Sequence, residues 1–229
     1  MNAKLSQKAY ELVRMTDCVA IKPNQTFEDI KKLVAYAKEY DFFLVYGLQC
    51  YNEYMLRELK GSNTLVGGAI GCASSAGEEC LEEKIASAKH WMDVGCQELD
   101  MFINVPALRS KQYDLVEKEM KAIRDIAVNT PLKALIQSPM LSDEEIKIVS
   151  EMAVAAKFDF VKTASGFYGG TTIEQVKIIK EAVGNKAQIK AAGGVDGLAM
   201  IEELKALGVT RFGLSYGKVL KLIDELADK

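Results

Sequence analysis

Eight short apolar runs alternate with longer amphipathic segments along the chain, and this alternation constrains the fold more than any other feature. Most runs are bounded by Gly, Pro, Asn, Asp or Lys, which is typical of strands buried on both faces. The expected strands are 17–21, 42–46, 65–70, 98–103, 132–136, 158–163, 188–192 and 211–215. Eight strand–helix units in 229 residues predict an α/β fold, a closed (β/α)8 TIM barrel. An open doubly wound sheet is the alternative, less favoured because no GxGxxG follows the first strand.

The segments between the runs carry signals for helix ends. A short N-terminal helix is expected over residues 3–14, before the first strand. Thr26 precedes an acidic first turn, and Ser142 and Thr172 are each followed three residues later by an acid or an amide, as in a capping box. Gly95 and Gly208 lie where helices should end. Because no linker or low-complexity segment interrupts the chain, the sequence predicts one domain spanning residues 1–229.

The composition excludes several classes of function. Lys and Arg number 29 against 32 Asp and Glu, a net charge of −3, which gives no broad basic patch for nucleic acid. No apolar run reaches the roughly 18 residues that span a bilayer, and charged residues interrupt the first 15, so neither a membrane segment nor a signal peptide is expected. Five scattered cysteines and one histidine argue against disulfides and a zinc site. The sequence therefore predicts a reduced, cytoplasmic protein without a bound metal.

Three charged residues interrupt the buried strands near the ends where barrel enzymes carry their reacting groups: Asp100, Lys162 and Lys190. A lysine in a buried strand must reach the barrel mouth or be neutralised, because burying an unpaired charge is unfavourable. A cationic neighbour and desolvation both lower a lysine pKa, and the neutral amine can attack a carbonyl to form an imine. A carboxylate beside it can carry protons. The three residues thus favour imine chemistry, with rim lysines or a structural ion pair as the alternative.

Three segments resemble motifs of the deoxyribose-phosphate aldolase family. Residues 160–167, FVKTASGF, resemble the family's imine-forming F-[IV]-K-T-S-T-G segment. Residues 98–104 are similar to E-[IL]-D-M-V-I-N, and residues 190–195 are similar to K-A-[AS]-G-G-[IV]. Weaker similarities at 17–23, 141–145 and 211–215 follow in the same order, so the resemblance extends over most of the chain.

The resemblance implies a class I aldolase that needs no metal or cofactor. It implies that Lys162 forms the imine, Lys190 tunes it and Asp100 takes part in proton transfer. The family cleaves 2-deoxy-D-ribose 5-phosphate reversibly to D-glyceraldehyde 3-phosphate and acetaldehyde. The residues expected to bind substrate or its phosphate are Asp17, Lys22, Ser165, Gly166, Gly193, Gly194, Gly213 and Ser215. Exposed N–H groups at helix starts after the seventh and eighth strands suit a phosphate, although these glycines could equally serve only as tight turns. A small sugar phosphate or aldehyde is the expected partner, and a homodimer is expected from barrel enzymes in general.

Several residues at the expected rim depart from the family pattern. Asp196 replaces the usual Arg, Cys18 replaces His, and Gln137 replaces a carboxylate. Residues 45–49 replace C-V-N-P, and residues 71–75 replace G-F-P-x-G. Asp196 is a suitable helix N-cap but opposes a phosphate, and Lys218 is expected to compensate.

These departures leave the substrate open at the level of sequence. They fit an aldolase that prefers a different or unphosphorylated aldehyde. A barrel that binds a phosphorylated metabolite without aldol chemistry, with Lys162 and Lys190 as anion ligands, is the second alternative. A structural relative that neither catalyses an aldol reaction nor binds such a metabolite is the third alternative.

Overall fold

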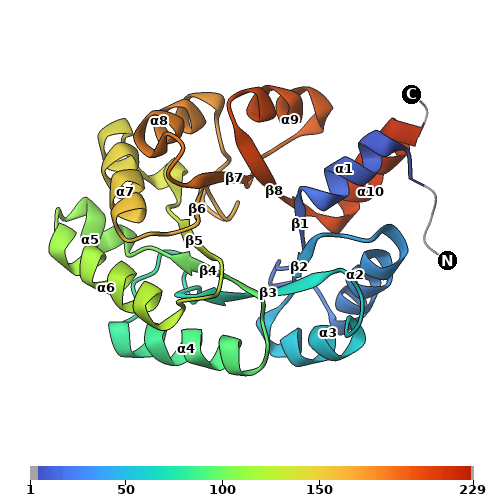
Figure 1. Ribbon diagram of the computed structural model, residues 1–229, viewed down its shortest axis with the longest axis horizontal. Coiled ribbons are helices and arrows are strands. Elements are labelled where there is room, and N and C mark those ends of the chain that lie inside the picture. The colour runs from blue at the N-terminus through green and yellow to red at the C-terminus, as the bar shows by residue number, and fades with distance from the viewer. Residues whose placement is uncertain (1–4, 228–229) are drawn as a thin grey trace.

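The computed structural model describes residues 5–227 and contains eight parallel strands that close into a barrel in sequence order, surrounded by helices (Figure 1). The strands are β1 (Thr16–Val19), β2 (Leu44–Tyr46), β3 (Leu65–Ile70), β4 (Glu98–Phe102), β5 (Leu132–Leu135), β6 (Phe160–Lys162), β7 (Gln188–Ala192) and β8 (Val209–Ser215). Strand β1 pairs with β8 as well as with β2, which closes the sheet. The predicted (β/α)8 barrel is confirmed, and the open doubly wound sheet is wrong.

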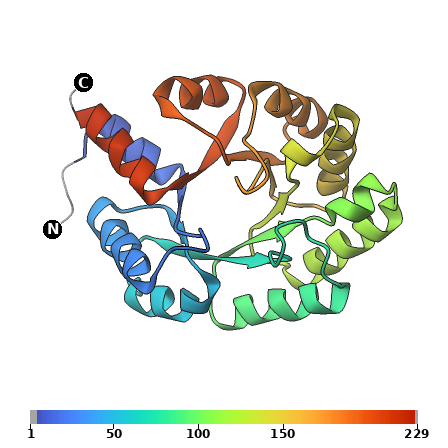
Figure 2. The same ribbon diagram turned by 180° about the vertical axis from the view of Figure 1, so that it is seen from behind.

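Ten α-helices lie within the described residues, and two 3-10 turns, Gln49–Tyr51 and Ser138–Met140, follow β2 and β5. The helices are α1 (Gln7–Arg14), α2 (Phe27–Tyr40), α3 (Asn52–Glu58), α4 (Leu81–Asp93), α5 (Val105–Arg109), α6 (Tyr113–Ile126), α7 (Asp143–Ala155), α8 (Ile173–Val183), α9 (Gly197–Ala206) and α10 (Tyr216–Ala227). Helices α1 and α10, the first and the last helix, lie side by side (Figure 2). No helix within residues 5–227 is long and apolar enough to cross a membrane.

The N-terminal helix begins later than expected. Its first expected residues, 3 and 4, lie outside the described part, and the helix starts at Gln7 because the Ser6 hydroxyl accepts a hydrogen bond from the Ala9 N–H at 3.2 Å. The other signals for helix ends hold. Ser142 and Thr172 form capping boxes, and the Thr26 N–H donates to Asp29 at 2.8 Å.

Strand alternation separates two layers of side chains. Residues that point away from the barrel axis pack with the helices in one apolar core, and Cys18 is among them, fully buried. Cys18, expected from the sequence at the rim, instead points outward, since its strand neighbours Asp17 and Val19 take the inward positions. The inward layer holds seven charged side chains, unlike the branched apolar filling usual in such barrels. That layer forms the candidate site.

Candidate active site

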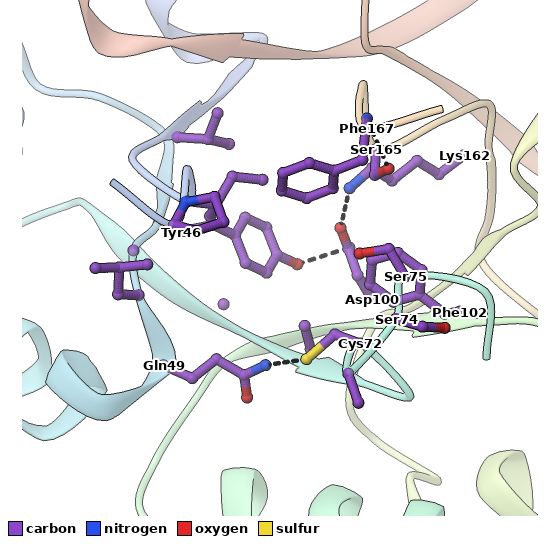
Figure 3. Close-up of a pocket in the computed structure, with 18 of the residues that line it drawn as sticks. Tyr46, Gln49, Cys72, Ser74, Ser75, Asp100, Phe102, Lys162, Ser165 and Phe167 are labelled. Carbon is purple, nitrogen blue, oxygen red and sulfur yellow. Dashed lines mark hydrogen bonds and ion pairs between the residues drawn. The ribbon is translucent and has the colours of Figure 1, made fainter. Parts of the chain in front are cut away.

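Asp100 on β4 is the centre of the inward layer (Figure 3). Its Oδ2 accepts hydrogen bonds from Lys162 Nζ at 2.6 Å and from Lys190 Nζ at 3.2 Å. Its Oδ1 accepts a hydrogen bond from the Tyr46 hydroxyl at 2.7 Å and lies 3.3 Å from Lys133 Nζ. The two lysines and the carboxylate selected from the sequence thus meet through one carboxyl oxygen, although they come from three strands.

A second set of charges lies beside Asp100 inside the barrel. Lys190 Nζ is 2.5 Å from Asp17 Oδ2, and Asp17 Oδ1 accepts from Arg211 at 2.8 Å. Lys133 Nζ is 2.5 Å from Glu98 Oε2, which also accepts from Arg211 at 3.4 Å. Asp17 and Glu98 thus provide the lysines with further carboxylate partners besides Asp100, and the whole set forms one continuous ion-pair network.

The network carries one more positive group than negative. Its carboxylates are Asp17, Glu98 and Asp100, and its cations are Lys133, Lys162, Lys190 and Arg211. Nearly all of these side chains are buried, so the excess charge is poorly solvated. Loss of one proton would balance it, which favours a neutral amine somewhere in the cluster.

The pKa shifts follow from burial and from these neighbours. Burial lowers the pKa of Lys190 to about 8, although the carboxylates of Asp100 and Asp17 partly oppose it. Burial also favours the neutral form of Asp100, but three lysine ammoniums outweigh it and hold the pKa of Asp100 well below its usual value. For Lys133, burial is outweighed by three carboxylates, and its pKa rises to about 12. Asp100 is therefore an anion and Lys133 a cation at neutral pH, whereas Lys190 exchanges its proton easily.

Access to solvent distinguishes the two central lysines. The Lys162 side chain is 10% exposed and lines a cavity of about 580 Å³ together with Tyr46 and Asp100. The Lys190 side chain is 0% exposed and does not line that cavity. Only Lys162 can meet a substrate carbonyl without rearrangement.

A second cavity of about 710 Å³ adjoins the first at the barrel mouth, and the two share Val19, Ile21, Pro23, Ser165 and Phe167. Seven of the eight residues expected to bind substrate or phosphate line it: Lys22, Ser165, Gly166, Gly193, Gly194, Gly213 and Ser215. The eighth, Asp17, is fully buried and lines neither cavity, because its carboxylate points below the mouth to Lys190 and Arg211. Asp17, expected from the sequence to bind substrate, therefore lies away from both cavities and pairs with Lys190 and Arg211.

The glycines of the second cavity allow the loops after β6 and β7 to pack together, and they present backbone N–H groups without acceptors. A Cβ on Gly193 would lie 2.7 Å from the Gly166 nitrogen, and one on Gly194 would lie 2.6 Å from the Gly170 Cα. The loops after β6 and β7 can therefore pack together only because these residues lack side chains. Within residues 5–227, no acceptor binds the N–H groups of Gly193 or Gly194. Both N–H groups remain available for an anion.

Asp196 differs from its expected role as a helix cap. It precedes α9, but its side chain accepts no capping hydrogen bond. Instead its Oδ1 lies 2.9 Å from Lys218 Nζ, which also donates to the Val195 carbonyl at 2.7 Å. Lys218 lines the second cavity and Asp196 does not, so the compensation expected of Lys218 has a structural basis.

Gln137 lies behind the site. It is buried with a left-handed backbone, φ 53°, and lines neither cavity. Its side-chain oxygen accepts from the Ser165 N–H at 2.9 Å, and its Nε2 donates to the Ser165 hydroxyl at 2.9 Å. Gln137 thus fixes the loop that follows Lys162, where the family pattern has a carboxylate.

Four residues of the site were not identified from the sequence: Tyr46, Glu98, Lys133 and Arg211. Lys133 carried the same signal as Lys162, a lysine inside a short apolar strand, and could have been found. Glu98 and Arg211 lie within segments that resemble the family. Tyr46 gave no signal, since an aromatic residue in a strand normally packs in a core.

Comparison with known proteins agrees with this arrangement. No family model matches the chain. The deoxyribose-phosphate aldolase of Finegoldia magna is 37% identical over 219 residues, which cover 93% of this chain and 99% of that protein. The chain belongs to the deoxyribose-phosphate aldolase family. The family's enzyme from Streptococcus sanguinis is also 37% identical, over 94% of this chain and 97% of its own length.

Solved structures of aldolases share the fold. The aldolase QR15 superposes with a TM-score of 0.86 at 27% identity, covering 95% of this chain and 96% of that one. The tetrameric deoxyribose phosphate aldolase from Aeropyrum pernix superposes with a TM-score of 0.85 at 22% identity, covering 96% of this chain and 92% of that one. The barrel described above is thus the fold of deoxyribose-phosphate aldolases.

Proposed function

We propose that this chain cleaves 2-deoxy-D-ribose 5-phosphate reversibly to D-glyceraldehyde 3-phosphate and acetaldehyde, through an imine on Lys162. Membership of the deoxyribose-phosphate aldolase family supports the reaction, an aldehyde-lyase reaction. The observation that carries the mechanism is the position of Lys162: its Nζ lines the cavity and lies 2.6 Å from an ionised Asp100.

The bond-breaking steps follow from this geometry. The neutral amine of Lys162 attacks the C1 aldehyde, and loss of water gives a protonated imine. This cation withdraws electrons, so the C2–C3 bond breaks as the C3 hydroxyl loses its proton to Asp100. The electron pair remains as an enamine of acetaldehyde, while C3 becomes the aldehyde of D-glyceraldehyde 3-phosphate. Protonation of C2 and addition of water then release acetaldehyde and restore the amine.

Lys190, Lys133 and Tyr46 support this cycle without forming a bond to carbon. Lys190 and Lys162 share Asp100 Oδ2, so Lys190 holds the carboxylate that lies beside the reacting amine. The Tyr46 hydroxyl donates to Asp100 and lies 3.2 Å from Lys133 Nζ. It therefore keeps the carboxylate in place beside Lys162 when the proton moves.

The phosphate of the substrate would lie in the second cavity. Its walls offer the free N–H groups of Gly193 and Gly194 and the ammonium groups of Lys22 and Lys218. Helix α10 begins directly after Ser215, so its N-terminal N–H groups face the same cavity. This anion site continues the cavity that holds Lys162, as a five-carbon phosphate ester requires.

A barrel that only binds an anion with its two lysines is the weaker alternative. Lys190 is fully buried between Asp17 and Asp100, and Lys162 already pairs with Asp100. Neither ammonium is free to bind an anion, so imine formation fits the arrangement better. The predicted homodimer and cytoplasmic location stay predictions, and sedimentation would test the first.

Reductive trapping tests the proposal. The protein is incubated with acetaldehyde or with deoxyribose 5-phosphate, reduced with borohydride, digested and mapped by mass spectrometry. We expect an adduct on Lys162 that is lost in Lys162→Ala. Lys180→Ala serves as the matched control, because Lys180 is half-buried on α8 and lies outside both cavities, and it should retain the adduct. An adduct that persists in Lys162→Ala, or no adduct with either compound, would refute the assignment.

A further inference from the structure

A buried ion pair lies outside the barrel, in the layer of helices, and the proposed reaction makes no use of it. It joins α4 to α6, which lie side by side (Figure 1). The side chains of Lys84 on α4 and Glu119 on α6 are 0% and 3% exposed, and Lys84 Nζ lies 2.6 Å from Glu119 Oε2. Removing two charges from water is unfavourable, and apolar side chains of similar size often stabilise a protein as well or better. Stability alone therefore explains this pair poorly.

The other hydrogen bonds of the pair connect it to the loop that follows β3. Lys84 Nζ donates to the Gly77 carbonyl oxygen at 2.5 Å, and Gly77 belongs to the loop over residues 71–80, which joins β3 to α4. Within residues 5–227 this carbonyl accepts no other hydrogen bond. Glu119 Oε1 accepts from the Asn104 side-chain amide at 3.1 Å, and Asn104 caps α5 just after β4. Lys84 thus links the loop after β3 to the end of β4.

Gly77 is also where the loop contacts the strand that carries Asp100. Its φ of 68° lies in the left-handed region, which glycine adopts without strain. A Cβ on Gly77 would lie 2.2 Å from the Ile103 carbonyl oxygen and 2.5 Å from that of Phe102. The loop therefore packs directly on the backbone just beyond Asp100, and the Gly77 carbonyl is the point at which Lys84 holds it.

The same loop forms one wall of the cavity that holds Lys162. Four of its residues line that cavity and none of the four lines the second cavity: Cys72, Ala73, Ser74 and Ser75. The Ser74 carbonyl accepts from the Tyr168 hydroxyl at 2.5 Å, and the Ser75 carbonyl accepts from the Gln137 side-chain amide. Tyr168 lies on the loop after Lys162, and Gln137 also binds that loop. A shift of the loop after β3 would therefore move both the wall and the segment that follows the reacting lysine.

We propose that Lys84 is a positioning residue for the aldol reaction: its ammonium holds the Gly77 carbonyl, and with it this wall of the cavity, while Glu119 balances its charge. The inference rests on the proposed function, because the wall encloses the imine proposed on Lys162. Without the ammonium, the Gly77 carbonyl would be buried with no donor, which is unfavourable. The loop would then turn this carbonyl toward water, and the wall would leave its place beside the substrate.

Two variants separate the position of the loop from the stability of the protein. The double variant Lys84→Met/Glu119→Leu replaces the pair with apolar side chains, so its urea midpoint should equal or exceed that of wild type. Its kcat/KM for deoxyribose 5-phosphate should nevertheless fall by about ten- to a hundredfold, because the wall is displaced. Glu119→Gln should do the reverse. It leaves the hydrogen bond from Lys84 to Gly77 in place but the ammonium without a counter-charge, so the midpoint should fall while the folded protein keeps its kcat/KM.

A second lysine–glutamate pair provides the matched control. Lys205 and Glu202 are 3.0 Å apart on the exposed face of α9, and neither lines a cavity at the barrel mouth. Lys205→Met/Glu202→Leu makes the same two substitutions there and should leave kcat/KM unchanged. Circular dichroism at the assay temperature shows which variants are folded, so that kcat/KM is compared among folded proteins only.

The outcomes separate the inference from the function on which it rests. If wild type neither cleaves deoxyribose 5-phosphate nor forms an adduct on Lys162, the proposed function fails and the inference fails with it. If wild type reacts and the folded double variant keeps its kcat/KM, the function stands and Lys84 does not position the wall. Equal losses of kcat/KM in Glu119→Gln and in the double variant would also contradict the inference. A double variant that does not fold would show that the pair serves stability instead.

Discussion

Gly67 on β3 and Tyr46 on β2 share one space inside the barrel: a Cβ on Gly67 would lie 2.2 Å from Cζ of Tyr46 and 2.7 Å from its hydroxyl oxygen. The missing side chain lets the tyrosine ring lie across the barrel, with its hydroxyl on Asp100. The ring centre is 4.8 Å from Lys190 Nζ and 5.7 Å from Lys162 Nζ, within the range of cation–π attraction. The absence of a side chain at Gly67 thus determines the position of the Tyr46 ring.

Gly67→Ala should displace the ring of Tyr46 and destabilise the protein by about 1–3 kcal/mol through overpacking. The cost should fall sharply when Tyr46→Ala is introduced as well, because the clash is then gone. Urea unfolding of wild type, both single variants and the double variant gives the coupling energy. Additive costs would mean that the two residues do not compete for space.

Tyr46→Phe should lower kcat by about ten- to a hundredfold while leaving the fold intact. The change removes the 2.7 Å hydrogen bond to Asp100 and the contact with Lys133, but keeps the ring. The readout is kcat against pH, with circular dichroism as the check on folding. A kcat equal to that of wild type at every pH would show that the hydroxyl has no part in proton transfer.

Lys190 should make stability depend on pH between about 8 and 10.5. Burial lowers its folded pKa to about 8 from the usual 10.5, so in that interval the unfolded chain binds more protons than the folded one. The free energy of unfolding contributed by this group therefore rises with pH through the interval, and the cost of burying the charge is present in full below pH 8. Unfolding of wild type and Lys190→Met at several pH values should give a difference that changes in this direction. A constant difference would place the folded pKa of Lys190 at its usual value.

Lys218→Met should raise the KM for deoxyribose 5-phosphate several-fold and leave that for deoxyribose unchanged, since Lys218 lines only the second cavity. Asp196→Asn should lower the KM for the phosphate ester, because it frees the Lys218 ammonium from the carboxylate 2.9 Å away. Asp224→Asn, on the last helix and outside both cavities, is the matched control for the charge change. Equal effects on both sugars would assign Lys218 to something other than phosphate.

The barrel itself was predictable from sequence because its two signals, short apolar runs for the strands and capping residues for the helix ends, are local. Each strand is a short apolar run, and most observed strands lie within or close to the expected ranges; Leu65–Ile70 and Gln188–Ala192 agree at both ends. Four strands end one or two residues earlier than expected, as at Phe160–Lys162, because the residues beyond them continue the apolar pattern past the end of the strand.

The site was predictable only in part, because it depends on distances across the barrel. Lys162, Lys190 and Asp100 were found from charge in buried strands and from the family resemblance. The directions of the side chains could not be predicted. Asp17 points below the mouth and Cys18 points outward, because the register of the strand determines which of its residues face the barrel axis. Tyr46 could not be inferred, since its place depends on a glycine 21 residues away in sequence.

The uneven count of charges inside the barrel has a consequence beyond catalysis. A structure with one more cation than anion in its interior is electrostatically frustrated, and removing a lysine would relieve it. Lys162, one of the lysines whose removal would do so, is also the proposed nucleophile. Selection for thermal stability alone would therefore favour replacement of this lysine, which would remove the proposed activity. The protein retains the reactive amine and is less stable than a variant without it.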